Sequence, residues 1–206
     1  METRLNKYLS ECGYCSRREA DRLIQADRVT INDELPELGT KVKEGDIVKV
    51  DGKGISSQEE YVYIALNKPI GITSTTDKAD PTNIVDFMKY RKRIFHIGRL
   101  DKDSEGLVIL TSDGDLAHKL MHPSNLVVKR YYVSLEEPFP AGRLRQLLRG
   151  VVIEGEHLKV ERANLVNPKT DRSSTELDVH MHHGKKREIR QLFTALGFQV
   201  RRLRRY

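Results

Sequence analysis

A glycine-bounded acidic stretch is the part of this sequence best suited to chemistry. Residues 98–114 read GRLDKDSEGLVILTSDG, with Asp101, Asp103 and Glu105 crowded before an apolar run. The run from Leu107 to Thr111 has the length and composition of a buried strand. A strand that begins directly after a carboxylate-rich loop can hold those carboxylates rigidly, as acid–base or nucleophilic chemistry requires. A solvated acidic turn is the ordinary alternative.

A calcium loop is a second alternative for the same residues. Asp101, Asp103, Glu105 and Gly106 fit the opening of an EF-hand loop. The twelfth position of such a loop should supply a bidentate Glu, and here it is Ser112. The loop also runs into a strand pattern rather than a helix, so we reject a calcium site.

The stretch satisfies the pattern G-R-L-D-x-D-[ST]-x-G-L-[LV]-[LIV]-L-T-x-D-G, and in this it resembles the central motif of the RsuA-like pseudouridine synthases (RsuA, RluB, RluE and RluF), which act on ribosomal RNA. The resemblance implies that Asp101 is the essential catalytic carboxylate. Earlier in the chain, Asn67-Lys68-Pro69 followed by Gly71 is similar to the L-N-K-P-x-G that family members carry, and Ser74-Thr75-Thr76 with Asn83–Phe87 looks most like the RluF-type branch.

Length and composition restrict the number of domains and the kind of partner that the protein can have. The chain has 206 residues, 38% hydrophobic and 32% charged, with a formal net charge of +6. This length suits one large or two small domains, and the basic balance favours a polyanionic partner. The sequence shows neither an apolar run of membrane-spanning length nor a signal peptide, so we expect a cytoplasmic protein.

Metal-ligating residue types are present but not arranged as ligands. Cys12 and Cys15 form a C-x-x-C pair without a second pair, and partly buried thiols are the simpler interpretation. His180, His182 and His183 have no evident Cys or Glu partner and fit a polar strand end. We therefore expect no metal and no small-molecule cofactor.

The N-terminal segment carries cations where helix electrostatics disfavours them. Ser16 and Glu19 form a capping box that should begin a helix. Arg17 and Arg18 then occupy the first turn, although the positive end of the helix dipole repels cations. Phosphate contact explains this placement, because cations beside free backbone N–H groups make an anion site. Two ordinary surface arginines are the alternative.

The same segment resembles the S4-type RNA-binding domain, named for a ribosomal protein. The shared pattern is R-L-x-K-x-L, then S-R-R-E-A, then V-x-[VI]-N-G and G-D, with Asp27 and Asp33 here in place of two glycines. Asp tolerates left-handed turns better than most residues, so the fold should survive. The resemblance implies RNA contacts by Arg4, Lys7, Arg17 and Arg18.

We therefore predict an α+β protein with a small S4-type domain at 1–50, a linker at 51–60 rich in Gly, Ser and charge, and a catalytic domain at 61–206 whose C-terminal end is shorter than usual for the family. The catalytic domain should be a mixed, mainly antiparallel sheet flanked by helices. Within it we expect a helix at 83–91 with Ile84 and Phe87 inward, and one strand at 157–166.

An aromatic strand residue is the expected stacking platform for the base. Lys129-Arg130-Tyr131 opens a strand, and the family carries a K-x-Y motif there whose Tyr stacks on the target base. Strand alternation points Tyr132 to the opposite face, so only one tyrosine can serve. Half-buried strand filler is the alternative for Tyr131.

The basic motif near the C-terminus, Gly184-Lys185-Lys186-Arg187-Glu188-Ile189-Arg190, should open a helix. It resembles the family pattern G-[KR]-x-[RH]-Q-[IV]-[RK]-R-M, with Glu188 in place of Gln and Gln191 in place of the next basic residue. The resemblance implies that one basic residue of this motif pairs with Asp101. Lys185 is the first candidate and Arg187 the second, and Arg190 also occupies a motif position. We expect Arg99 to fill the gap in the RNA or to hold the flipped nucleotide, and Arg187 and Arg190 to bind the substrate with it.

The predicted function is the site-specific isomerisation of uridine to pseudouridine in ribosomal RNA, of the large subunit, by a monomer with base flipping and a catalytic Asp101. A non-catalytic RNA-binding factor for ribosome assembly is the alternative, because the N-terminal domain fits both. A carboxylate-based hydrolase ranks third, since the sequence singles out no second catalytic carboxylate beyond Asp103.

Overall fold

The computed structural model describes residues 2–56 and 60–206. Its contacts divide the chain into two compact units. The first comprises the chain up to Ile64 with Lys89–Phe95 and Leu110–Leu116, and the second comprises Ala65–Met88, His96–Ile109 and Ala117–Tyr206.

The first unit begins with two short helices packed on small sheets. Its elements are β1 (Thr3–Arg4), α1 (Leu5–Glu11), α2 (Arg17–Gln25), β2 (Val29–Ile31), β3 (Lys41–Val42), β4 (Val48–Val50) and β5 (Lys53–Gly54). β1 pairs with β3, and β2, β4 and β5 form an antiparallel sheet. Apolar residues at helical spacing, including Leu5, Leu9, Leu23 and Ile24, are buried against Val29 and the strand valines.

Local signals in this unit act largely as the sequence predicts. The Ser16 hydroxyl accepts a hydrogen bond from the Glu19 N–H at 3.2 Å and caps α2. The Glu19 carboxylate does not complete the predicted capping box but pairs with Arg22 at 3.1 Å. Asp27 and Asp33 have φ of +54° and +68°, so both adopt the left-handed conformation expected where the family carries glycine.

Part of the predicted linker is folded. β5 lies inside the stretch 51–60, and the Ile55 N–H donates to the Val48 carbonyl at 2.9 Å. Residues 57–59 of the predicted linker lie outside the described residues.

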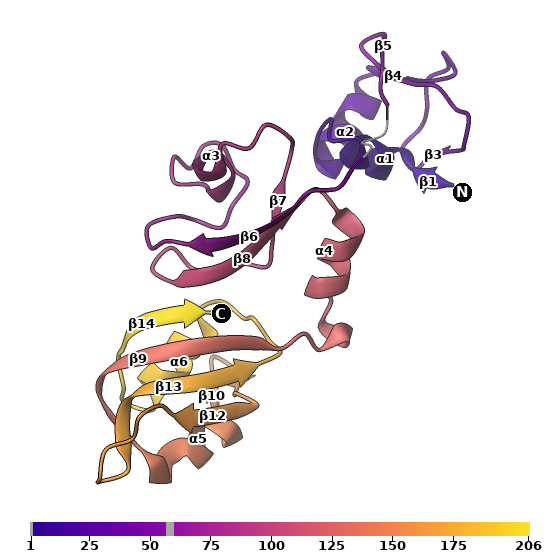
Figure 1. Ribbon diagram of the computed structural model, residues 1–206. Coiled ribbons are helices and arrows are strands. Elements are labelled where there is room, and N and C mark those ends of the chain that lie inside the picture. The colour runs from indigo at the N-terminus through magenta and orange to yellow at the C-terminus, as the bar shows by residue number, and fades with distance from the viewer. Residues whose placement is uncertain (1, 57–59) are drawn as a thin grey trace. The chain divides into compact units, whose positions relative to one another are not determined.

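A large mixed sheet carries the second unit. Its order is β12-β13-β9-β14-β8-β6, with β7 also paired to β8. β9 is antiparallel to β13 and β14, whereas β14 runs parallel to β8, which confirms the predicted mixed sheet (Figure 1). The strands are β6 (Tyr63–Lys68), β7 (Phe95–Ile97), β8 (Glu105–Thr111), β9 (Lys129–Pro140), β12 (Arg162–Leu165), β13 (Ser173–Met181) and β14 (Val200–Arg205).

Helices flank this sheet and complete its core. They are α3 (Ile84–Met88), α4 (Gly114–Met121), α5 (Leu144–Arg149) and α6 (Glu188–Ala195), with the 3-10 turns Pro123–Asn125 and Ala141–Arg143. Leu147 of α5 and Phe193 of α6 are fully buried, and Phe193 meets the Phe139 ring edge-on at 5.8 Å. Apolar burial of this kind supplies most of the stability of such a layered fold.

Three sequence-based expectations are wrong in detail. The strand predicted at 157–166 is two strands, because β11 (Glu156–Leu158) pairs with β10 (Val151–Ile153) and β12 pairs with β13. The predicted helix at 83–91 is only α3, and Phe87 is 45% exposed rather than inward. The helix expected to open at Gly184 begins at Glu188.

Gly106 shows why a glycine stands at the start of β8. A Cβ on Gly106 would lie 2.0 Å from the backbone oxygen of Arg205, and its φ is +107°. Only glycine permits this approach between β8 and β14. The parallel pairing of these strands therefore depends on the glycine that follows the acidic loop.

No helix in the described part of the chain is long and apolar enough to cross a membrane.

Candidate active site

The acidic loop is fixed by a buried serine. It joins β7 to β8, and its Leu100 is buried. The Ser74 hydroxyl donates to the Leu100 carbonyl at 2.9 Å and accepts from the Leu100 N–H at 3.1 Å. The Asp101 carbonyl then accepts from the Ser104 N–H at 3.0 Å. Asp101 thus lies in a turn that is hydrogen-bonded on both sides, a rigid support for a reacting group.

A buried lysine supports the segment next to the loop, in which the Gly71 N–H donates to the Lys102 carbonyl at 2.8 Å. Lys68, at the end of β6, has no exposed surface, and its ammonium donates to the carbonyls of Pro69 at 3.1 Å and Ile72 at 2.8 Å. Burial lowers the pKa of Lys68, while the negative charges of Asp103 and Asp101 raise it. The sequence contained the Asn-Lys-Pro motif, but no pattern indicated that its lysine would be a buried brace.

Two arginines of the basic motif also bind the loop. Arg187 donates from Nη1 and Nη2 to the two carboxylate oxygens of Asp103, at 3.1 and 2.9 Å. Arg190 donates from Nη2 to the Asp103 carbonyl at 3.0 Å, and its side chain is only 13% exposed. Burial alone would raise the pKa of Asp103, but the hydrogen bond from Arg187 and the charges of both arginines lower it.

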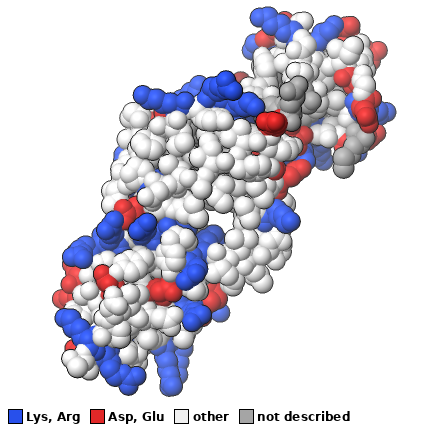
Figure 2. All heavy atoms as spheres, in the orientation of Figure 1, with Lys and Arg blue, Asp and Glu red and all other residues white. Residues whose placement is uncertain are grey.

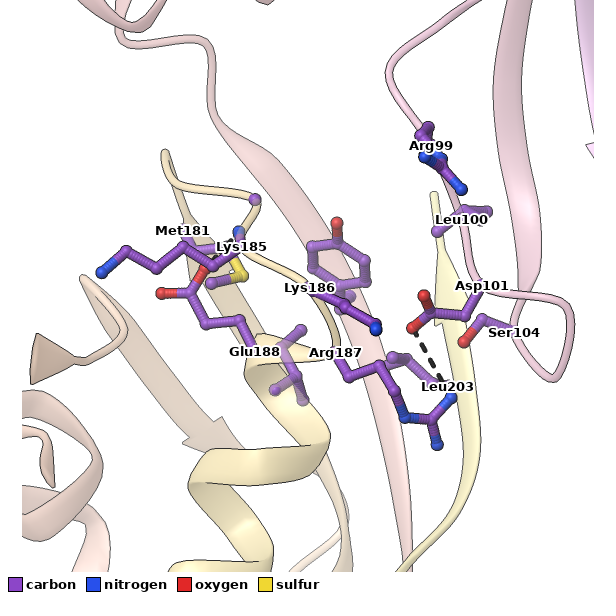
Figure 3. Close-up of a pocket in the computed structure, with 13 residues that line it drawn as sticks. Arg99, Leu100, Asp101, Ser104, Met181, Lys185, Lys186, Arg187, Glu188 and Leu203 are labelled. Carbon is purple, nitrogen blue, oxygen red and sulfur yellow. Dashed lines mark hydrogen bonds and ion pairs between the residues drawn. The ribbon is translucent and has the colours of Figure 1, made fainter. Parts of the chain in front are cut away.

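The cation nearest Asp101 is Arg187, the second candidate. Its Nη1 lies 4.0 Å from Asp101 Oδ2. Lys185, the first candidate, instead pairs with Glu156 at 3.1 Å, and Figure 3 shows its side chain extending away from Asp101. The pairing predicted for Lys185 is therefore wrong.

Backbone geometry explains why Arg187, rather than Lys185, lies near Asp101. Residues 184–187 form a loop before α6, and Arg187 has a φ of +53°, the left-handed conformation. This turn directs Arg187 toward the acidic loop, and Figure 3 shows Lys186 extending the same way. The Lys185 N–H donates to Glu188 Oε2 at 2.9 Å, which fixes the loop start. Lys186 was missed because its motif position allows any residue.

These groups line one cavity of about 450 Å³, a size suited to a small ligand. Tyr131 forms a wall and is 6% exposed; burial raises the pKa of its hydroxyl. Tyr132 neighbours Glu176 rather than the cavity, as strand alternation predicts. The lining residues are Arg99, Leu100, Asp101, Ser104, Tyr131, Met181, Gly184, Lys185, Lys186, Arg187, Glu188, Ile189 and Leu203 (Figure 3).

The predicted RNA-contact residues lie in the first unit. Arg17 and Arg18 are exposed in the first turn of α2, and Arg4 is exposed just before α1. Lys7 already forms ion pairs, because its ammonium lies 3.3 Å from Glu11 and 2.8 Å from Asp115.

Among the described residues, no three His, Cys, Asp or Glu side chains are grouped to hold a metal. Burial raises the pKa of Cys12 and Cys15.

The cavity thus brings together a carboxylate on a hydrogen-bonded loop, a guanidinium beside it and an aromatic wall, as the resemblance to pseudouridine synthases predicts. A family model described as "RNA pseudouridylate synthase" matches residues 62–195 of this chain, and an S4 domain model matches residues 3–48. The chain belongs to the RNA pseudouridylate synthase family, and the predicted α+β fold with an S4 domain is confirmed.

Known relatives place the chain within the family. It is 43% identical over 204 residues to the dual-specificity RNA pseudouridine synthase RluF of Escherichia coli K12, covering 98% of this chain and 68% of the relative. It is 40% identical over 208 residues to an uncharacterized RNA pseudouridine synthase of Mycobacterium leprae, covering 97% and 80%. A solved pseudouridylate synthase structure superposes with a TM-score of 0.65 at 29% identity, covering 98% and 87%. The resemblance to RsuA-like enzymes and RluF is confirmed.

Proposed function

We propose that this protein isomerises a specific uridine of ribosomal RNA, in the large subunit, to pseudouridine, and that Asp101 is the catalytic carboxylate. The observation that carries the proposal is Asp101 in a cavity beside Arg187, on a loop held by Ser74. Similarity to an enzyme named as a dual-specificity RNA pseudouridine synthase supports the substrate class.

The reaction makes and breaks a balanced set of bonds. The bond between uracil N1 and ribose C1′ breaks, and a bond between C5 and C1′ forms. C5 loses a proton and N1 gains one, so there is no redox step and no net hydrolysis. The nucleotide must leave the RNA stack to reach the cavity, which costs a few kcal/mol.

Each side chain has a task that its surroundings suit. Asp101 acts at the ribose or the base, and Arg187 lies 4.0 Å from its carboxylate, where a cation can stabilise developing charge. Tyr131 lies against the flipped uracil, since an aromatic face accepts an unstacked base. Arg99, exposed at the cavity rim, contacts the flipped nucleotide. Arg190 acts through Asp103 rather than on the substrate, because its side chain is nearly buried.

We further propose that the S4 segment, residues 1–50, selects the RNA through Arg4, Arg17 and Arg18, and that residues 61–206 perform the chemistry. The protein acts as a monomer in the cytoplasm, where ribosomal RNA is modified. Arg17 and Arg18 support this assignment because both are exposed at the helix N-terminus.

Pseudouridine mapping tests the proposal. Ribosomal RNA from cells lacking the protein is incubated with the wild-type chain or with Asp101→Asn, and pseudouridine is located at single-nucleotide resolution. We expect wild type to restore pseudouridine at one or a few uridines and Asp101→Asn to restore none. If wild type binds this RNA and restores no pseudouridine, the chain is an RNA-binding assembly factor instead.

A further inference from the structure

The segment Lys89-Tyr90-Arg91-Lys92-Arg93, called the basic segment below, has no part in the proposed chemistry. It follows α3 and belongs to the same compact unit as α1 and α2. Lys89, Tyr90 and Arg91 are exposed, and Lys92 is partly exposed. Four cations in five residues at the surface call for a physical explanation, because like charges repel.

Within the described part of the chain, the basic segment has no carboxylate partner. Among the described residues, none of its four cations has a carboxylate within 4.0 Å, and Arg17 and Arg18 have none either. Figure 2 shows lysine and arginine side chains gathered in groups rather than evenly spread. Four other cations of the unit are paired, Arg22 with Glu19, Arg28 with Asp51, Lys41 with Glu2 and Lys49 with Asp33.

Arg93 ties the basic segment to the S4 helices. Its Nη1 donates to the Ser10 hydroxyl of α1 at 3.4 Å, and its guanidinium lies 5.6 Å from the centroid of the Phe95 ring. Burial raises the pKa of Cys15, and the nearby charge of Arg93 partly offsets that rise. Because Cys15 lies two residues before Arg17, the basic segment is anchored beside the turn that presents Arg17 and Arg18.

Exposed aromatic side chains accompany these cations. Tyr14, in the turn between α1 and α2, is 45% exposed, and Tyr90 is 41% exposed. Exposed tyrosines offer a π-face on which unstacked bases can lie, and arginines beside them contact phosphate. An acidic protein surface would pair with the cations but not with the tyrosines, whereas RNA can contact both the cations and the tyrosines.

We infer that the basic segment binds the phosphodiester backbone of the RNA substrate, and that with Arg17 and Arg18 it makes one RNA-binding surface on the first unit. The inference rests on the proposed function, because it takes ribosomal RNA as the ligand. The S4 helices therefore do not bind RNA alone, since a segment from between β6 and β7 contributes to the same surface.

The test removes three cations and keeps the anchor. The full-length variant carries Lys89→Ala, Arg91→Ala and Lys92→Ala, and Arg93 is left in place. The matched control carries Lys53→Ala, Lys159→Ala and Lys169→Ala, three exposed lysines that lie elsewhere, so net charge falls equally. Affinity for a ribosomal RNA fragment is measured over a salt series, beside single-turnover pseudouridine formation at saturating RNA.

We expect the slope of log affinity against log salt to flatten by about 2 to 3 in the test variant, since each phosphate that a cation neutralises contributes about 0.7 to 0.9 to that slope. The control should keep the wild-type slope, and both variants should keep the maximal rate. A test slope equal to that of the control overturns the inference and leaves the proposed function intact. If the wild type itself forms no pseudouridine, the proposed function fails, while the salt series still decides the inference.

Discussion

Arg187 donates to both carboxylate oxygens of Asp103, at 3.1 and 2.9 Å, and by this bond its guanidinium is held 4.0 Å from Asp101. Asp103 is thus the residue that positions the cation, and the Asp101 carboxylate is left facing the cavity. A fork-shaped guanidinium can serve two carboxylates in this way, whereas an ammonium cannot match the bidentate geometry.

Asp101→Asn should reduce pseudouridine formation by about 10³-fold or more, since a positioned acid–base group contributes 10²- to 10⁴-fold and a nucleophile more. Asn is nearly isosteric but can act neither as base nor as nucleophile. Single-turnover assays on ribosomal RNA measure the loss, and thermal unfolding and RNA affinity serve as controls that should stay near wild type. A rate close to wild type would refute the assignment of Asp101.

Arg187→Ala should lower the single-turnover rate by about 10²-fold, the usual effect of removing one charge-stabilising donor. Lys185→Ala is the matched comparison and should lower it far less, because Lys185 pairs with Glu156. Arg187→Lys should recover only part of the rate. Equal losses in the two alanine variants would mean that Lys185 reaches the substrate despite that pair.

Asp103→Asn should change the pH dependence of stability. The folded-state pKa of Asp103 is lowered, so its stabilising contribution is fully present above the ordinary value of 3.8 and is lost as pH falls through the folded pKa. The free energy of unfolding of the wild type should therefore exceed that of Asp103→Asn by more at neutral pH than at about pH 3. The side chain is 46% exposed, so the difference should be small. Denaturant unfolding over a pH series measures it, with the exposed Glu44→Gln as control.

Lys68→Met should destabilise the protein by about 1–3 kcal/mol, because it leaves the carbonyls of Pro69 and Ile72 without their donor. Activity should fall as well, since the segment that Lys68 holds also hydrogen-bonds to the acidic loop, from the Gly71 N–H to the Lys102 carbonyl. Lys102→Met, an exposed neighbour in the loop, removes the same charge and should have little effect on the free energy of unfolding. Similar losses of unfolding free energy in both variants would show that the positive charge, and not the buried hydrogen bonds of Lys68, stabilises the protein.

Arg17→Ala with Arg18→Ala should weaken RNA binding without altering the chemical step. The slope of log affinity against log salt should flatten by about 0.7 to 0.9 for each phosphate that the variant no longer neutralises. Affinity over a salt series and single-turnover rates at saturating RNA give the two readouts. An unchanged slope would make these arginines ordinary surface charges.

The sequence alone determined the family, the S4 segment and the position of Asp101, because these rest on residue types at fixed spacing along the chain. Local signals such as the Ser16 cap and the left-handed Asp27 and Asp33 also follow from neighbouring residues. Tyr131 could be separated from Tyr132 because alternation along a strand is a local property.

Only the tertiary structure decided which cation meets Asp101. Arg187 has a left-handed backbone just before α6 begins, and its side chain donates to Asp103, which lies 84 residues away in the chain. Lys68 is buried and donates to the carbonyls of Pro69 and Ile72, and Phe87 of α3 is exposed although its spacing from Ile84 predicts an inward side chain. Such pairing and burial depend on residues distant in sequence, and no periodicity or local spacing encodes them.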